Sequence, residues 1–464
     1  MHRKRVCKAL VWRLSKQACF IMSVPIFLSA CFEQTGRPES VLDAMSTVLS
    51  DTEITSQENG RIEIEIESGF ATALRGAVLS NTYYKAALAV ERSMLSKIAS
   101  AESAQRTQIR GSSTVGGVRE TGGNSADKTT KGAAAGVNLS QIIYDGGLSS
   151  SNINQATAQS LGAVAERHIV GNDIALEAAQ AWIDYWQYQR RLGILRARTS
   201  EMDSLMSKME RMANNGLIDR SALDSARRQS LDMSLEEKLL LSGLDEARTN
   251  FKRFFHQEVI DVSRPEEIID LNEARVQAEN WREAPALQKL AAEVVVANNS
   301  VMIAKSAFKP QARLQAGVSS PMDEQDSTDT TIGVIFEYTF GDGGKRAANL
   351  EEAEAGLEAA KLRLDDVQTE FAAEMETALN KLNSLHAALP LVEKKISLSK
   401  IEVETARSQL STGQSNLRQL IDAELENYRA EDKQITLSAE KLTLQFGIAA
   451  KTGALGNLIS LDSP

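Results

Sequence analysis

The sequence repeats itself, and this duplication limits the possible folds more than any other feature of the chain. Residues 135–147 read AGVNLSQIIYDGG and residues 332–344 read IGVIFEYTFGDGG, with five identities at a displacement of 197. Further pairs follow the same frame or a nearby one: Gly216 with Gly413 and Leu223 with Leu420 at 197, and Ile98-Ala99 with Ile303-Ala304 at 205. Several matches in one frame predict two copies of one unit of about 200 residues.

The two copies also set the expected domain limits. We expect a targeting segment at residues 1–30 and an acidic N-terminal segment at 31–69. Repeat 1 should span 70–260 and repeat 2 should span 282–452, with a linker at 261–281 between them and a tail at 453–464. Each repeat opens with a helical segment, about 70–104 and 282–308.

Two short strands follow in each repeat, because apolar and polar residues alternate there. In residues 331–338, Ile332, Val334, Phe336 and Tyr338 fall on one face. We expect strands at about 105–118, 132–142, 311–319 and 331–340. Such alternation is typical of a transmembrane β-hairpin, although an ordinary soluble hairpin shows it too. The change of displacement falls between residues 111 and 135, which predicts a surface loop of variable length.

A long helical hairpin should complete each repeat, at 146–255 and 344–451. Apolar residues recur there at steps of three and four, which packs helices as in coiled coils. The first seam is Ile174, Ala178, Ala181, Tyr185, Tyr188, Leu192, Leu195, Thr199, Met202, Met206, Met209 and Ala213. The second is Leu350, Ala353, Leu357, Ala360, Leu364, Val367, Phe371, Met375, Ala378, Leu382, Leu385 and Leu389. Pro390 predicts a break or kink.

Glycines mark the turns of both repeats. We expect strand-to-helix turns at Asp145, Gly146, Gly147, Asp342, Gly343 and Gly344. Gly216 and Gly413 fit the left-handed ends of the long helices, where each hairpin turns back.

The N-terminus reads as a secretion signal. Residues 1–16 hold six basic and no acidic residues, and the apolar stretch from Ala18 to Ala30 is too short to span a membrane. Leu28-Ser29-Ala30-Cys31 resembles a bacterial lipoprotein box, which would make Cys31 the lipidation site; an ordinary signal peptide is the alternative. Without residues 1–30 the net charge of −10 becomes −16, which disfavours nucleic acid as a partner.

Nothing in the composition points to an enzyme. The three cysteines all lie in the first 31 residues and the four histidines are scattered, so we expect no disulfide, no metal and no cofactor in the body of the chain. No set of nucleophile, base and acid and no phosphate loop is evident.

Together, the lipoprotein-type signal, the duplicated order of helix, strand, strand and long hairpin, and DGG after the second strand resemble the TolC-like outer membrane factors. The resemblance covers about residues 70–455. It implies a mainly α fold with a membrane β-barrel part. In such a fold three chains share a 12-stranded barrel, and an α-helical tunnel crosses the periplasm. The loops at residues 111–135 and 320–330 would face outward.

This resemblance implies a homotrimeric channel in the outer membrane of a Gram-negative bacterium. Its partners would be outer membrane lipid, a periplasmic adaptor (membrane fusion) protein and an inner-membrane ABC or proton-driven transporter. The channel would be the exit duct for type I protein secretion or small-molecule efflux, and the closeness of the DGG repeats favours secretion. The alternative is a periplasmic coiled-coil adaptor or a structural protein of an export complex, although an adaptor normally has one hairpin and no duplication.

The resemblance also suggests a periplasmic gate after Gly413. The family has two aspartates there: Asp422 matches one, and Gln419 stands at the other. Arg418, at i−4 from Asp422, is the nearest basic residue that could offset a ring of carboxylates. The family's other closing contacts involve a tyrosine, an arginine, a threonine and an aspartate, and the matching positions here are Leu410, Ser415, Ser221 and Ala222. Of these, only Ser221 keeps the side-chain chemistry, with a serine in place of the threonine.

Overall fold

A computed structural model describes residues 69–120, 128–216, 220–257, 261–267, 271–320, 328–412 and 417–461. All of these lie in one structural unit, residues 62–464. The signal segment, Cys31, Gly413, Ser415 and the loop tips at 121–127 and 321–327 fall outside the described residues.

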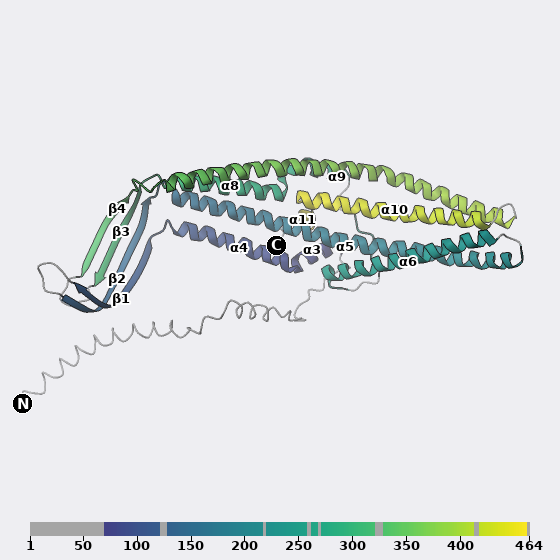
Figure 1. The fold of residues 1–464 in the computed structure, drawn as a ribbon, viewed down its shortest axis with the longest axis horizontal. Coiled ribbons are helices and arrows are strands. Elements are labelled where there is room, and N and C mark those ends of the chain that lie inside the picture. The colour runs from purple at the N-terminus through teal and green to yellow at the C-terminus, as the bar shows by residue number, and fades with distance from the viewer. Residues whose placement is uncertain are drawn as a thin grey trace, which may run out of the picture. The chain divides into compact units, whose positions relative to one another are not determined.

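The described chain is mainly helical with one sheet, which confirms the mainly α part of the predicted class (Figure 1). The first repeat contains α3 Phe70–Ser80, α4 Thr82–Ser103, β1 Gln108–Glu120, β2 Lys128–Tyr144, α5 Leu148–Asn214 and α6 Arg220–Phe255. The second contains α7 Leu271–Glu279, the 3-10 turn η2 Trp281–Glu283, α8 Pro285–Ser306, β3 Gln311–Ser320, β4 Asp329–Glu337, α9 Lys345–Ser411, α10 Leu417–Thr452 and α11 Ala454–Leu458.

The lengths of the elements reveal the duplication directly. Helices α5 and α9 both have 67 residues, and α6 and α10 both have 36. Both pairs begin 197 residues apart. A helix of 67 residues is about 100 Å long at 1.5 Å per residue.

The expected displacement of 205 before the strands is wrong. Helices α4 and α8, both of 22 residues, begin 203 positions apart, and so do β1 and β3. The extra residues of repeat 1 lengthen its strands rather than its loop, because β1 and β2 stay paired as far as Glu120 and Lys128. Strands β1 and β2 have 13 and 17 residues, against 10 and 9 in β3 and β4.

Pro390 does not break α9, which continues from Lys345 to Ser411. Proline removes one hydrogen bond and costs about 3 kcal/mol within a helix. Pro390 is exposed, and buried Leu382, Leu385 and Ile396 anchor the helix on both sides of it. Packing on both sides therefore outweighs the local cost.

The sheet is antiparallel, with the order β1-β2-β3-β4. Strands β1 and β4 are its two edges. The sheet lies at one end of the long helices, and both helical hairpins turn at the other end (Figure 1).

The helices form two rows. Next to the sheet the order of contact is α4, α5, α8, α9, and toward the hairpin turns it is α6, α5, α10, α9. All residues of the two predicted seams are buried or half-buried. An aromatic cluster lies where α3, α5, α6 and α10 meet, with Phe70 5.2 Å from Trp182 and 5.5 Å from Phe446 between ring centroids.

Candidate functional site: the sheet, its turns and the hairpin tips

The two strand-to-helix turns are built in the same way. The Asp145 carboxylate accepts hydrogen bonds from the backbone N–H groups of Gly147 (3.0 Å) and Ser149 (2.7 Å). Asp342 accepts equivalent bonds from Gly344 (3.1 Å) and Arg346 (2.9 Å). Each aspartate therefore satisfies free N–H groups at the start of a 67-residue helix.

Glycine is needed at both turns because the backbone is left-handed there. The φ angles are +68° and +96° at Gly146 and Gly147, and +68° and +94° at Gly343 and Gly344. The two turns differ in their surroundings. A Cβ at Gly146 would lie 2.7 Å from Lys309 Cβ, whereas nothing lies within 4 Å at Gly343.

Replacing Asp145 by alanine should destabilise the protein by about 1 kcal/mol, because it removes the cap of α5. Asp145→Asn, which keeps an oxygen acceptor without the charge, is the control. Burial raises the pKa of Asp145, but hydrogen bonds from Ser149, Gly147 and Leu148 outweigh it and lower the pKa from its ordinary 3.8.

A lowered pKa in the folded state contributes stability that is present above pH 3.8 and is lost as the pH falls below it. The difference in melting temperature between wild type and Asp145→Asn should therefore shrink below pH 3.8. A difference that stays constant down to pH 2–3 would contradict the capping role of the charge.

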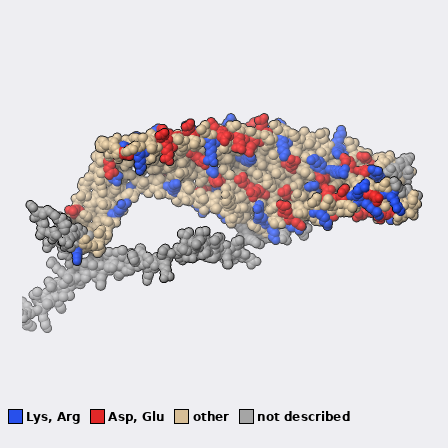
Figure 2. All heavy atoms as spheres, in the orientation of Figure 1, with Lys and Arg blue, Asp and Glu red and all other residues tan. Residues whose placement is uncertain are grey.

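Over the middle of the sheet, the four strands separate apolar from polar residues. The pairs Ile109↔Leu139, Val137↔Val318 and Ala316↔Ile332 keep apolar residues on one face, and Arg110↔Asn138 and Ser140↔Gln315 keep polar residues on the other. The apolar face is open to the surroundings: Ile109 is 72% exposed, Val115 81%, Ile332 80% and Phe336 76%. Charged side chains are sparse over the strands and frequent over the helices (Figure 2).

The tip of the second hairpin brings the predicted residues together. Arg418, Gln419 and Asp422 lie on one exposed side of α10. Arg418 Nε is 3.9 Å from Asp422 Oδ2, and Asp422 Oδ1 accepts a hydrogen bond from Gln229 of α6 at 3.2 Å. Asp422 remains 54% exposed. At the other tip, Gly216 has the expected left-handed φ of +70°.

Sequence reasoning missed an ionic cluster just above this tip. Glu424 of α10 is 6% exposed and lies 2.9 Å from Arg198 of α5, and it also pairs with Arg407 of α9. Glu201 lies 3.0 Å from Arg198 and 3.4 Å from Arg407. Burial lowers the pKa of Arg198, but the surrounding carboxylates outweigh it and raise the pKa above its ordinary value. The cluster joins the two hairpins.

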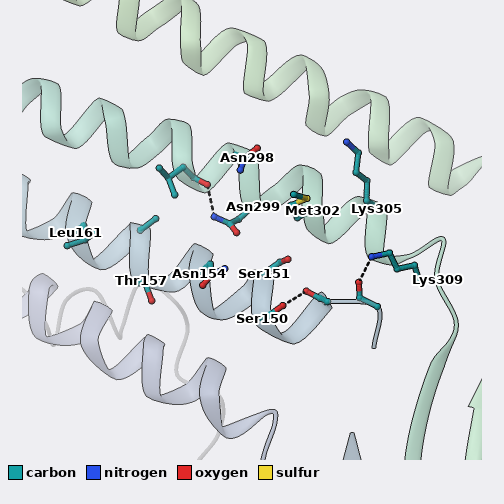
Figure 3. A pocket seen from close by; sticks show the side chains of 14 residues that line it. Ser150, Ser151, Asn154, Thr157, Leu161, Asn298, Asn299, Met302, Lys305 and Lys309 are labelled. Atoms are coloured by element: carbon teal, nitrogen blue, oxygen red, sulfur yellow. Dashed lines mark hydrogen bonds between the residues drawn. The ribbon is translucent and has the colours of Figure 1, made fainter. Parts of the chain in front are cut away.

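Below the sheet, a shallow groove of about 710 Å³ runs between α5 and α8 (Figure 3). Ser150, Asn154, Asn298 and Lys305 line it. Lys309 Nζ donates to the Gly146 carbonyl at 3.0 Å, which ties α8 to the turn. Lys305 lies 3.6 Å from Glu354 on α9. These lysines are thus already used in holding neighbouring elements together.

The described residues contain neither a metal-ligand cluster nor a membrane-spanning helix. No group of three or more histidine, cysteine, aspartate or glutamate side chains in that part of the chain could hold a metal ion. No described helix combines the length and the apolar character needed to cross a membrane.

Comparison with known proteins places these features in context. The model of the family described as "Outer membrane efflux protein" matches residues 279–454. The chain is similar to outer membrane efflux protein BepC of Brucella suis biovar 1 (strain 1330), with 21% identity over 435 residues, covering 89% of this chain and 90% of the relative.

Solved structures with the same fold come from several bacteria. The outer membrane protein VceC of Vibrio cholerae has a TM-score of 0.72 at 13% identity, over 82% of this chain and 96% of that one. The Campylobacter jejuni CmeC outer membrane channel has 0.70 at 14%, over 82% and 85%. The open state of the Neisseria gonorrhoeae MtrE outer membrane channel has 0.66 at 16%, over 83% and 88%. The likeness extends over both repeats.

Proposed function

The chain belongs to the outer membrane efflux protein family, the TolC-like channel proteins of the outer membrane, and we propose that it forms the exit duct of a tripartite export system. In this proposal three copies close their sheets into one 12-stranded barrel in the outer membrane. Their long helices form a tunnel through the periplasm.

The observation that carries the proposal is the exposed apolar face of the sheet. It runs across all four strands, opposite a polar face, and it ends at two free edges, β1 and β4. A membrane accepts such a sheet when the apolar face meets lipid, the polar face meets water and no edge is left open. Copies joined from edge to edge satisfy all three conditions.

Exposed apolar side chains on the helices also support a closed ring of copies. In the row α6, α5, α10, α9 the two end helices expose leucine stripes: Leu231, Leu235 and Leu239 on α6, and Leu391, Leu398 and Ile401 on α9. The two ends are different surfaces, so contact between the α6 end of one copy and the α9 end of the next is heterologous. Repeated heterologous contacts generate a ring when the rotation closes.

Hydrogen bonds show that the two stripes lie at one level of the row. Ser399 Oγ lies 3.0 Å from Asn427 Oδ1, and Tyr428 Oη donates to Glu236 at 2.8 Å. Since Leu398 precedes Ser399 and Leu235 precedes Glu236, the stripes are at matching heights on opposite ends. They can therefore meet in a ring of copies without sliding along the helix axis.

A duct of this kind works with a periplasmic adaptor and an inner-membrane transporter, either an ABC or a proton-driven one. The proposed channel could carry either of two cargoes, an unfolded protein or small molecules. The family model and the Brucella relative are both described as efflux proteins, so efflux is the cargo to test first. Deleting the gene and measuring drug accumulation and the secreted proteins in parallel would separate the two.

Fractionation tests the proposal against the adaptor alternative. The protein should be recovered in the outer membrane and run as a trimer on a gel before heating. Recovery with the inner membrane as a monomer would contradict the channel and favour an adaptor. We also propose that Cys31 is acylated and that the loops around 121–127 and 321–327 face outward; all three lie outside the described residues.

In the trimer, Asp422 places three carboxylates around the periplasmic mouth. Asp422→Asn should lower cation selectivity in planar bilayers, most at low salt, because screening is weak there. Arg418→Ala should make the mouth leakier, since the i−4 partner that offsets the repulsion is lost. Asp224→Asn, on the tip of the other hairpin, is the matched control. Unchanged selectivity at low salt would show that Asp422 does not line the mouth.

A further inference from the structure

The two free edges of the sheet carry complementary charges on the same face. Arg110 lies on edge strand β1 and Glu337 lies at the end of edge strand β4. Successive residues of a strand point to opposite faces. The registers Arg110↔Asn138↔Gly317↔Thr331 then put Arg110 and the odd-numbered residues of β4, including Glu337, on the polar face.

Within one chain these two residues cannot meet, because two strands separate them. Glu337 is used on one side only: its Oε2 accepts a hydrogen bond from Arg313 of β3 at 2.7 Å. Arg110 has no hydrogen bond or ion pair with any residue that the structure describes. The sheet therefore has an unpaired guanidinium on one edge, and on the other edge a carboxylate with a single ion-pair partner among the described residues.

The stagger of the strands indicates how the edges of two copies would align. Gln108, the first residue of β1, lies on the same row as Ser140, Gln315 and Gly333. Strand β4 continues four residues beyond this row, to Glu337. The β1 strand of a neighbouring copy must be shifted toward the helical end by at least four residues. Otherwise the last residues of β4 would have no partner strand, and the helical end of the closed sheet would be interrupted at every junction between copies.

Closure restricts the size of the shift. The shift must be even, since an odd one would put polar residues on the lipid face. With about 3.3 Å per residue and about 4.8 Å between strands, shifts of four and six per copy tilt the strands of a closed sheet of three copies by roughly 35–45°. Shifts of two and eight give tilts of roughly 20° and 55°, outside the usual range. Four and six remain.

Charge selects between these two. A shift of six places Arg110 of one copy directly opposite Glu337 of the next, whereas a shift of four places Gln108 there. We infer that β1 of one copy pairs with β4 of its neighbour so that Arg110 lies directly opposite Glu337, which is then held between Arg110 of the neighbour and its own Arg313. The sheet shows that this kind of contact is reachable, because Arg313 already meets Glu337 from the adjacent diagonal position.

This inference rests on the proposed edge-to-edge assembly and specifies its register. The closed trimer would contain three such charge clusters, one at each junction between copies. They would lie on the polar inner face near the helical end of the sheet. Opposite charges at directly paired positions stabilise a strand pair and disfavour other registers.

Disulfide trapping tests the register. Every native cysteine lies at or before Cys31, so introduced cysteines are alone in the strands. Directly opposite residues have Cβ atoms about 4.5–5.5 Å apart, close to disulfide range, whereas diagonal ones are about 7–8 Å apart. Arg110→Cys with Glu337→Cys should give covalent dimers and trimers on non-reducing gels. Gln108→Cys or Ser112→Cys with Glu337→Cys should give far fewer, and Ile109→Cys with Glu337→Cys, on opposite faces, none.

The outcomes separate this inference from the assembly itself. Efficient trapping with Gln108→Cys or Ser112→Cys instead of Arg110→Cys would overturn the register and keep the closed sheet. If no pair is trapped while the wild type runs as an oligomer, the two edges do not meet here. A wild type that runs as a monomer would overturn the proposed function as well.

A second measurement covers the case in which the cysteine variants do not fold. Arg110→Glu should lower the temperature at which the oligomer dissociates on a gel by several degrees, and Arg110→Lys should restore most of the loss. Ser112→Glu, on the same strand and face, is the control. Equal effects of Arg110→Glu and Ser112→Glu would contradict a specific pair.

Discussion

Arginine in place of Ile332 is expected to abolish stable assembly in the outer membrane. Ile332 is 80% exposed on the apolar face, opposite Ala316 and near the middle of β4. An arginine facing lipid near the bilayer midplane costs about 2–4 kcal/mol. Each of the three chains of the proposed assembly would carry this cost. The measurement is the amount of heat-dissociable oligomer in the outer membrane fraction.

The neighbouring residue provides the control. Thr331 pairs with Gly317 on the polar face, so Thr331→Arg should insert normally and alter only conductance. If Thr331→Arg blocks assembly and Ile332→Arg does not, the assignment of the two faces is reversed.

Removing the charge of Glu424 should loosen the contact between the two helical hairpins. Breaking a buried ion pair by removing one partner typically costs about 3–5 kcal/mol, because it leaves an uncompensated charge. Arg198 keeps Glu201 and Glu431 as partners, so Glu424→Gln should cost about 3 kcal/mol, the lower end of this range. Amide hydrogen exchange around residues 420–431 should then be about 100-fold faster, since each 1.4 kcal/mol is a factor of ten.

A surface ion pair between α10 and α9 is the matched comparison. Glu426 lies 2.6 Å from Lys395, but their side chains are 41% and 56% exposed. Exposed pairs contribute about 0–1 kcal/mol, so Glu426→Gln should change exchange little. Equal protection in Glu424→Gln and wild type would show that apolar packing alone holds the hairpins together. A leakier channel in Glu424→Gln would connect the cluster to the closed state.

Much of the fold follows from local patterns that any copy of this sequence must carry. Alternation at residues 331–338 determines which side chains share a face, because the strand period is two. Repeating apolar steps determine the buried sides of α5 and α9, because the helix period is 3.6. DGG determines the two strand-to-helix turns, because the backbone there has positive φ and the aspartate caps the next helix.

Local patterns were misleading where packing competes with them. Pro390 is a helix breaker by itself, yet α9 continues through it because buried residues on both sides hold the helix. The displacement of 205 before the strands comes from a chance match of two residues, Ile98-Ala99 with Ile303-Ala304. The paired strands instead fix it at 203.

Only the tertiary structure could decide which charges matter. Arg198, Arg407 and Glu424 lie on three helices and are up to 226 residues apart, so no spacing in the sequence marks them. The same holds for Arg110, which is unpaired in the described chain, and for Glu337, which pairs there with Arg313 alone. The register of four strands determines that they share a face and how far apart they lie along the strands. Sequence periodicity sets which side of an element is buried, whereas contacts between distant elements set which polar groups find partners and which remain open for another copy.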